Sequence, residues 1–157
     1  MGKINVGRVV LGGIVAGIVF NIFGGLVDGW LLMPRWTAGL KVLGHSGFTA
    51  KQAIAYNLLG FAFGLTAVWI YAAIRPRFGA GMKTAVYAGI ALWIVGFLLP
   101  NSAFMYISHL FPRGLTAYTT LGALVEVLAA MVAGAALYKE SEAPVTEMAG
   151  AKARATA

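Results

Sequence analysis

Two carboxylic acids within apolar segments are the residues of this chain best suited to chemistry. The sequence has five acidic residues, and three of them lie beyond residue 139. Asp28 and Glu126 instead lie inside long apolar segments, where an ionisable side chain is costly and marks a candidate functional site. The amides of Asn21, Asn57 and Asn101 lie in the same kind of segment. A carboxylate accompanied by amides is suited to binding a proton or a cation.

Other motifs of catalytic chemistry are incomplete. Gly44-His45-Ser46-Gly47 contains a Gly-x-Ser, but Phe48 occupies the place of the second glycine of a nucleophile elbow. Segment 79–84 is not a phosphate-binding loop, because Met82 separates its last glycine from the lysine. The chain has no cysteine, which excludes disulfides, thiolate metal sites and cysteine nucleophiles. We therefore expect no enzymatic activity, no cofactor and no metal site.

The composition places the chain in a membrane. Of the 157 residues 60% are hydrophobic and 11% are charged, and the mean hydropathy is +0.82. A soluble globular domain has about 25% charged residues. This composition excludes an ordinary soluble domain, a disordered chain and a collagen-like chain. An integral membrane protein remains.

The spacing of charged residues predicts four transmembrane helices. Uncharged stretches of 19, 23 and 29 residues precede Asp28, Arg75 and Arg113, and a fourth apolar stretch is interrupted only by Glu126. A helix rises about 1.5 Å per residue, so about 20 residues cross a hydrocarbon core of ~30 Å. We therefore predict an all-α, four-transmembrane-helix bundle with antiparallel neighbours, with spans at about 8–33, 52–74, 84–111 and 115–138. This domain covers 1–138, and 139–157 is predicted to be a disordered cytoplasmic tail.

The basic residues predict the orientation. The N-terminus, the second loop and the C-terminal tail hold eight of the twelve Lys and Arg residues. Because basic residues near span ends stay in the cytoplasm, we predict a multi-pass protein of a bacterial cytoplasmic (inner) membrane with both termini cytoplasmic. The formal net charge of +7 is then explained by topology and by attraction to anionic lipid. The lipid bilayer is the expected partner, and nucleic acid is not, since the chain has no soluble basic face.

Glycines recur at helical spacing in the predicted spans and are expected to form the faces where helices pack. Lipid gives helices no hydrophobic drive to associate, so close backbone approach through small residues supplies the packing. The predicted packing positions are Gly13, Gly17, Gly24, Gly60, Gly64 and Gly122. In the first span these glycines share a face with Asn21 and Asp28, because the positions step by three or four residues. Such faces pack within the bundle, against copies of the chain as a homo-oligomer, or against a larger membrane complex.

Helix phase and depth predict a polar funnel that ends at Glu126. Counted from the outer end of its span, Glu126 lies about 16 Å deep, which is the middle of the bilayer. Asn21 lies near that depth, whereas Asp28, Asn57 and Asn101 fall in the outer third. A charged acid at the midplane costs about 2.5–3.5 kcal/mol on insertion scales. Glu126 is therefore interpreted either as a proton or cation site or as a neutral acid that hydrogen-bonds to Asn21 or to a backbone carbonyl.

Two local features near the outer ends of the spans predict specific contacts. Asp28 lies seven residues before Arg35, and we expect the two to form an interfacial ion pair. Pro100-Asn101 predicts a kink in the third span, because proline removes one helical hydrogen bond and clashes with the carbonyl four residues back.

The predicted loops are short. Segment 75–83 is expected to be a cytoplasmic turn, and 111–114 joins the third and fourth spans tightly enough to make them a hairpin. The first loop, 34–51, has room for structure of its own. Within it, Thr49-x-x-Gln52 resembles a capping box that opens the second span.

The order of these features resembles a family of uncharacterised, small four-helix bacterial membrane proteins known as a domain of unknown function. The resemblance rests on a Gly-rich first span ending in Asp28-Gly29-Trp30-Leu31-Leu32, on Trp36, on a loop with Gly44, and on the tight third-to-fourth hairpin. It covers most of 8–138. It implies a four-helix membrane fold and lends no activity and no catalytic residue.

Two classes of function follow from the sequence. The first is a non-catalytic accessory or oligomer-forming membrane module whose glycine faces pack against other chains. The alternative is a small proton- or cation-coupled transporter that uses Glu126, assisted by the predicted polar funnel. A buried packing acid and a transport acid have the same sequence signal, so both classes remain open at this point.

Overall fold

The computed structural model describes residues 3–140, and every regular element in that range is helical. Four segments are long and apolar enough to cross a membrane: Val6–Leu31, Ala50–Phe78, Met82–Ser108 and Arg113–Leu137. This confirms the predicted all-α class and indicates a multi-pass membrane protein. The bounds of the four segments differ from the predicted spans by a few residues. The predicted tail at 139–157 lies outside the described residues, apart from Lys139 and Glu140.

The first and third long segments are divided into shorter helical elements, whereas the second and fourth are single α-helices. The elements in chain order are α1 (Val6–Leu26), η1 (Val27–Leu31), α2 (Met33–Val42), α3 (Ala50–Phe78), α4 (Met82–Trp93), η2 (Ile94–Leu98), α5 (Leu99–Ala103), η3 (Phe104–Ser108) and α6 (Arg113–Leu137). The three η elements are π-helical. The short helix α2 occupies the first loop.

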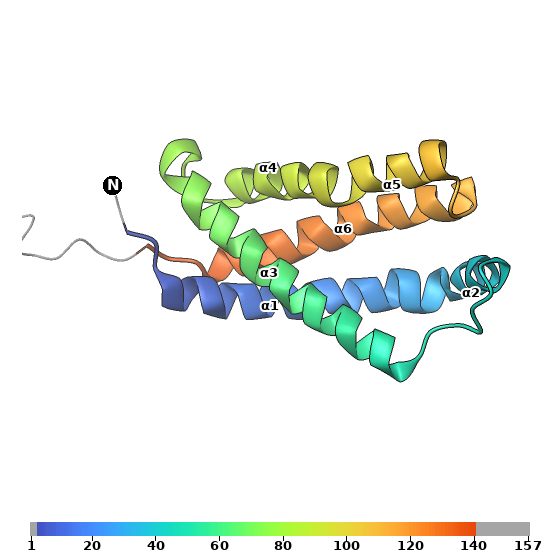
Figure 1. The fold of residues 1–157 in the computed structure, drawn as a ribbon. Coiled ribbons are helices and arrows are strands. Elements are labelled where there is room, and N and C mark those ends of the chain that lie inside the picture. The colour runs from blue at the N-terminus through green and yellow to red at the C-terminus, as the bar shows by residue number, and fades with distance from the viewer. Residues whose placement is uncertain (1–2, 141–157) are drawn as a thin grey trace, which may run out of the picture.

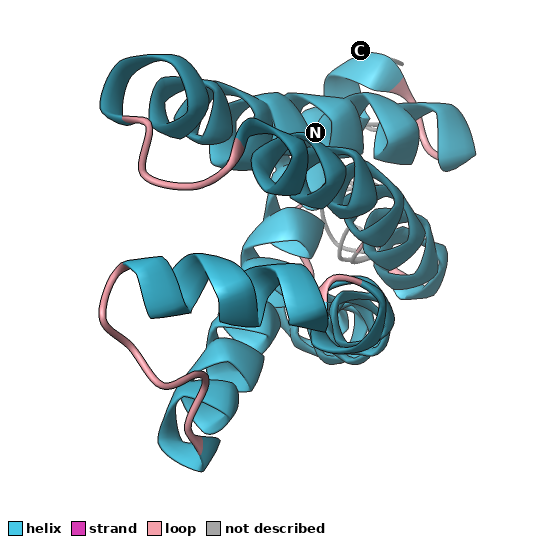
Figure 2. Cartoon of the chain, turned by 90° about the vertical axis from the view of Figure 1, so that its right-hand side faces the viewer, coloured by secondary structure: helices cyan, strands magenta, loops and turns pink. Residues whose placement is uncertain are grey.

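The helices form a bundle in which α3 runs obliquely to the others (Figure 1). In this view α1 lies along the lower side, α4 and α5 lie along the upper side with α6 between, and α3 crosses α1 and α6 diagonally. The main contacts are those of α1 with α3, of α1 with α6 and of α4 with α6. Seen from the end that carries α2, the described chain consists of helices and connecting loops (Figure 2). We call this end the α2 end and the opposite one, where α1 begins and α6 ends, the terminal end.

Small side chains fill the core at the helix crossings. Ala16 of α1, Ala67 of α3 and Ala130 of α6 are fully buried. Side chains of this size let α1 approach α3 and α6 closely, which is how helices gain packing energy in lipid.

The start of α3 is set by the predicted capping box. The Thr49 backbone N–H donates to Oε1 of Gln52 at 2.8 Å, and the Gln52 backbone N–H donates to Oγ1 of Thr49 at 3.3 Å. The two residues thereby satisfy each other's free backbone donors at the helix start. The capping-box prediction is confirmed.

The predicted turn at 75–83 is shorter in the structure. Helix α3 continues through Pro76 to Phe78, and the turn occupies 79–81. Pro76 cannot donate a backbone hydrogen bond, but it lies in the last turn, and the Gly79 N–H still donates to the Arg75 carbonyl at 2.8 Å. Gly79 and Gly81 have φ of 86° and 121°, a region that favours glycine, and they reverse the chain.

The chain around Pro100 is π-helical rather than regular α-helix. The π-helical turn η2 ends immediately before α5, and the Leu99 N–H donates to the Ile94 carbonyl, five residues back. Pro100 has no N–H for the carbonyl of Gly96, and its ring would clash with that carbonyl in a regular α-helix. The wider π-helical turn relieves this conflict. The structure therefore has π-helical turns on both sides of α5, at the position where the sequence predicts a kink.

Candidate functional site

The carboxylate of Glu126 lies inside the bundle with an unsatisfied oxygen. The residue lies in the middle of α6 and is 3% exposed. Its Oε1 atom is buried and has no hydrogen-bond partner among the described residues. Opposite the carboxylate lies Gly24 of α1, where an added Cβ would be 3.5 Å from Oε2. A Cβ added to Gly122 would be 3.7 Å from Oε1. The two glycines therefore leave the space that the carboxylate occupies.

Asn21 is engaged with α3 and not with Glu126. Its Nδ2 donates to the backbone oxygen of Asn57 at 3.1 Å. A Cβ on Gly60 would overlap Oδ1 of Asn21, so glycine at this position is required for the contact. The side-chain amide of Asn57 donates to the Ala53 carbonyl at 2.8 Å within α3. Of the alternatives considered for Glu126, a hydrogen bond to Asn21 is not formed, because packing of α1 on α3 turns the amide toward α3.

Asp28 is held by an indole and a hydroxyl. Its Oδ1 accepts from Nε1 of Trp36 on α2 at 2.9 Å and from Oγ1 of Thr119 on α6 at 3.4 Å. The predicted ion pair of Asp28 with Arg35 is wrong, since the Arg35 guanidinium lies 4.4 Å from the ring centroid of Tyr118. Successive residues of a helix point about 100° apart, so α2 directs Trp36 to the acid and Arg35 toward α6.

Asn101 belongs to the contact between α5 and α6. Its Nδ2 donates to Oγ1 of Thr120 at 2.8 Å, and that hydroxyl donates to the Thr116 carbonyl at 2.7 Å. The Trp93 indole donates to the Thr120 backbone oxygen at 2.8 Å. Asn101 therefore joins α5 to α6.

The structure does not join the five predicted polar residues into one funnel. It places the three asparagines and Asp28 in separate contacts, between α1 and α3, between η1, α2 and α6, and between α5 and α6.

The predicted packing glycines of α1 and α3 lie against each other. A Cβ on Gly64 would overlap the backbone of Gly13 and Gly17. Cβ atoms on Gly13 and Gly17 would in turn meet Leu65 and Phe61 at 2.6 Å. These glycines are thus enclosed by the chain's own helices and are not available to a second copy.

Sequence reasoning missed a second close contact, between α1 and α6. A Cβ on Gly12 would lie 2.6 Å from the carbonyl oxygen of Gly134, and a Cβ on Gly134 would lie 2.8 Å from that of Gly12. The available signal was the spacing of small residues four apart, from Gly12 to Ala16 and from Ala130 to Gly134.

An aromatic cluster lies beside the acid. The Phe20 ring centroid is 4.7 Å from that of Phe63 and 6.2 Å from that of Phe97, and the latter two are 6.0 Å apart. Phe20 precedes Gly24 by one helical turn toward the terminal end. The rings of α1, α3 and η2 therefore form an apolar layer on that side of the carboxylate.

Comparison with known proteins adds no function to this geometry. No family model, no curated protein and no solved structure matches the sequence. The resemblance to small four-helix membrane proteins therefore rests on features of the sequence alone.

Proposed function

We propose that this chain is a small proton-coupled membrane carrier that takes up a proton at Glu126. The observation that carries the proposal is the buried Oε1 atom, which has no hydrogen-bond partner among the described residues. An unsatisfied buried acceptor costs about 1–3 kcal/mol. A site that binds a proton explains why an acid occupies this position. Protonation removes the negative charge of Glu126 and turns its carboxylate into a carboxylic acid, which can donate a hydrogen bond.

A proton fits the surroundings of Glu126 better than a metal ion does. Gly24 and Gly122 lie against the carboxylate, and neither has a side-chain oxygen that could act as a ligand. Within residues 3–140 no group of three His, Asp or Glu side chains could hold a metal ion. A hard cation such as Ca²⁺ takes about six to eight oxygen ligands. A proton needs one.

The proposal includes an antiparallel arrangement with both termini in the cytoplasm of a bacterial inner membrane. Three contacts at the terminal end support it. The Asn5 N–H donates to the Tyr138 hydroxyl at 3.3 Å, the Tyr138 ring lies 6.0 Å from that of Tyr71, and the Gly81 N–H donates to the Tyr71 hydroxyl at 3.0 Å. The start of α1, the turn before α4 and the end of α6 thus lie together. Basic residues are concentrated around these segments, and such residues stay in the cytoplasm.

Infrared difference spectroscopy tests the proton site directly. Protein in lipid vesicles is compared in acidic and alkaline buffer, and the carbonyl stretch of protonated carboxylic acids is recorded. All carboxyl groups of the chain contribute to this region of the spectrum. A component from the buried Glu126 carboxyl is expected in the natural protein and in Glu140→Gln, which removes an acid outside the spans, and this component is expected to be lost in Glu126→Gln. A band that persists unchanged in Glu126→Gln contradicts the proton site.

Proton flux tests the carrier. A membrane potential is imposed across the same vesicles, and entry of protons is followed with an enclosed pH-sensitive dye. Flux above that of protein-free vesicles is expected for the natural protein and Glu140→Gln, and its loss is expected in Glu126→Gln. Equal flux in all three proteins contradicts proton movement through Glu126.

A non-catalytic, oligomer-forming module is the second candidate, and one observation favours it. Gly25, Gly29 and Gly96 are exposed, and an added Cβ on any of them would have no heavy atom within 4 Å. Gly25 and Gly29 are four residues apart, the spacing by which small residues bring two membrane helices together. Self-association would use this face, since Gly13, Gly17, Gly60 and Gly64 are already enclosed. Cross-linking of copies that is lost in Gly25→Leu and retained by Glu126→Gln supports this candidate.

A further inference from the structure

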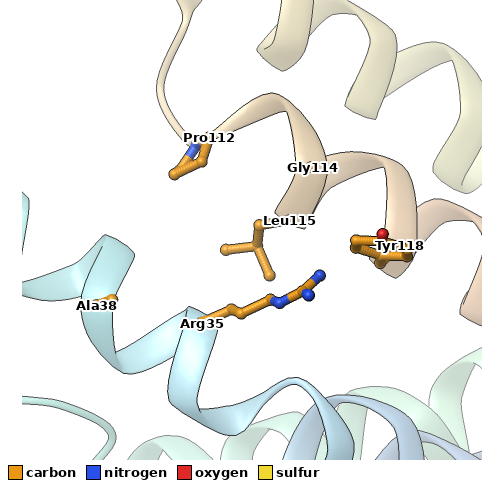
Figure 3. A pocket seen from close by; sticks show the side chains of 6 residues that line it. All are labelled: Arg35, Ala38, Pro112, Gly114, Leu115 and Tyr118. Carbon is orange, nitrogen blue, oxygen red and sulfur yellow. The ribbon is translucent and has the colours of Figure 1, made fainter.

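A pocket lies at the α2 end between α2 and the first turns of α6 (Figure 3). Its volume is about 420 Å³, and its lining residues are Arg35, Ala38, Pro112, Gly114, Leu115 and Tyr118. The Arg35 side chain extends along one wall toward Tyr118, with Leu115 on the other side (Figure 3). The pocket is therefore largely apolar, with a guanidinium at its edge.

Arg35 forms no ion pair with an acidic residue in the part of the chain that the structure describes. The guanidinium rests 4.4 Å from the Tyr118 ring centroid, and Asp28 is occupied by Trp36 and Thr119. The pocket has no acidic residue among the described residues that line it. A cation held against an aromatic face keeps its charge available to a further partner.

The start of α6 borders the same pocket, through Pro112, Gly114 and Leu115. Pro112 precedes α6 and provides no side-chain cap, and the first backbone bond is donated by Thr116 to the Pro112 carbonyl at 3.1 Å. The N–H groups of Gly114 and Leu115 therefore have no acceptor within the helix. Helix N-termini carry a partial positive charge. The start of α6 and the Arg35 guanidinium therefore both favour an anion in this pocket.

The depth of the pocket identifies the source of that anion. Two of the membrane-spanning segments end here, at Leu31 and at Arg113. Tyr118 contacts Arg35, Trp36 is the next residue of α2, and aromatic residues are enriched at the headgroup layer. An anion at this depth with an apolar attachment is the phosphate of a phospholipid, whose chains would lie along Ala38 and Leu115.

We propose that this pocket binds the headgroup of an anionic phospholipid. Arg35 pairs with the phosphate, the start of α6 contributes its free N–H groups, and the apolar wall receives the glycerol and the upper acyl chain. The inference does not depend on Glu126, which lies deeper in the bundle.

Native mass spectrometry of the full chain with phosphatidylglycerol or phosphatidylcholine tests the proposal. The natural protein is expected to retain one molecule of phosphatidylglycerol more tightly than phosphatidylcholine. Arg35→Gln is expected to weaken phosphatidylglycerol binding about fivefold, which corresponds to about 1 kcal/mol per basic residue near a membrane surface. Lys41→Gln removes a charge from α2 that does not line the pocket, and it is expected to leave binding unchanged.

The conservative variant Arg35→Lys separates charge from folding. It is expected to keep most of the phosphatidylglycerol binding, because an ammonium still pairs with phosphate. Two results would overturn the proposal: equal retention of the two lipids by the natural protein, or equal losses in Arg35→Gln and Lys41→Gln, which would indicate a diffuse surface-charge effect.

Discussion

Gly24 of α1 faces Glu126 of α6 so closely that a Cβ on the glycine would lie 3.5 Å from the carboxylate oxygen Oε2. A methyl group fits at that distance, but a larger side chain does not. The space for the buried acid is therefore determined by a residue on another helix, about one hundred positions away in sequence.

Gly24→Leu is expected to destabilise the fold by about 1–3 kcal/mol, because its branched side chain overpacks the space at the carboxylate. The free energy of unfolding is measured by titration with a denaturing detergent in mixed micelles. Gly25→Leu is the matched control, since a Cβ at that position would meet no heavy atom within 4 Å. Equal losses in the two variants would show that the contact with Glu126 is not the cause.

Glu126→Met is expected to raise the free energy of unfolding by about 1–3 kcal/mol, because methionine has similar size and removes an unsatisfied buried oxygen. The same titration measures the change. Asn101→Leu is the contrasting variant, because it removes the 2.8 Å hydrogen bond to Thr120 and is expected to lower stability. A loss of stability in Glu126→Met would mean that the carboxylate has a stabilising partner.

Gly64→Ala is expected to lower stability by about 1–3 kcal/mol, since its Cβ would overlap the backbone of Gly13 and Gly17 and force α1 away from α3. Gly96→Ala places the same methyl group where nothing lies within 4 Å, so it should leave stability nearly unchanged. Unfolding curves of the two variants, recorded side by side, check this difference. A tolerated Gly64→Ala would contradict the close crossing.

Trp36→Phe is expected to cost about 1 kcal/mol, because it keeps an aromatic ring but removes the donor that lies 2.9 Å from Asp28. Trp30, which is 75% exposed, provides the matched control as Trp30→Phe. A double-mutant cycle with Asp28→Asn measures the coupling between indole and carboxylate. Zero coupling in the cycle would exclude the bond as a source of stability.

The natural lack of cysteine allows topology to be tested with single cysteines. In intact bacterial cells, Lys51→Cys at the α2 end is expected to react with a membrane-impermeant maleimide. Lys139→Cys at the terminal end should react only after the cells are permeabilised. Labelling of both positions in intact cells would contradict the proposed orientation.

The sequence by itself determined the helical class, the approximate bounds of the four long apolar helices and the cap at Thr49. These features depend on local properties: the length of an apolar stretch, the positions of charges, and donors and acceptors three residues apart. The sequence also identified Asp28 and Glu126 as the acids within these helices. The turn predicted at 75–83 was too long, and this error also has a local cause. A proline in the last turn of a helix disrupts it less than a proline in its middle, so α3 continues through Pro76.

Only the tertiary structure decided which groups these residues meet. Asp28 meets Trp36 and Thr119 instead of Arg35, Asn21 meets Asn57 instead of Glu126, and the Glu126 Oε1 atom is left without a partner among the described residues. Each outcome depends on the rotation of a helix about its axis and on the helix it crosses. Both are set by the joint packing of side chains from α1, α3 and α6, and no single helix contains that information.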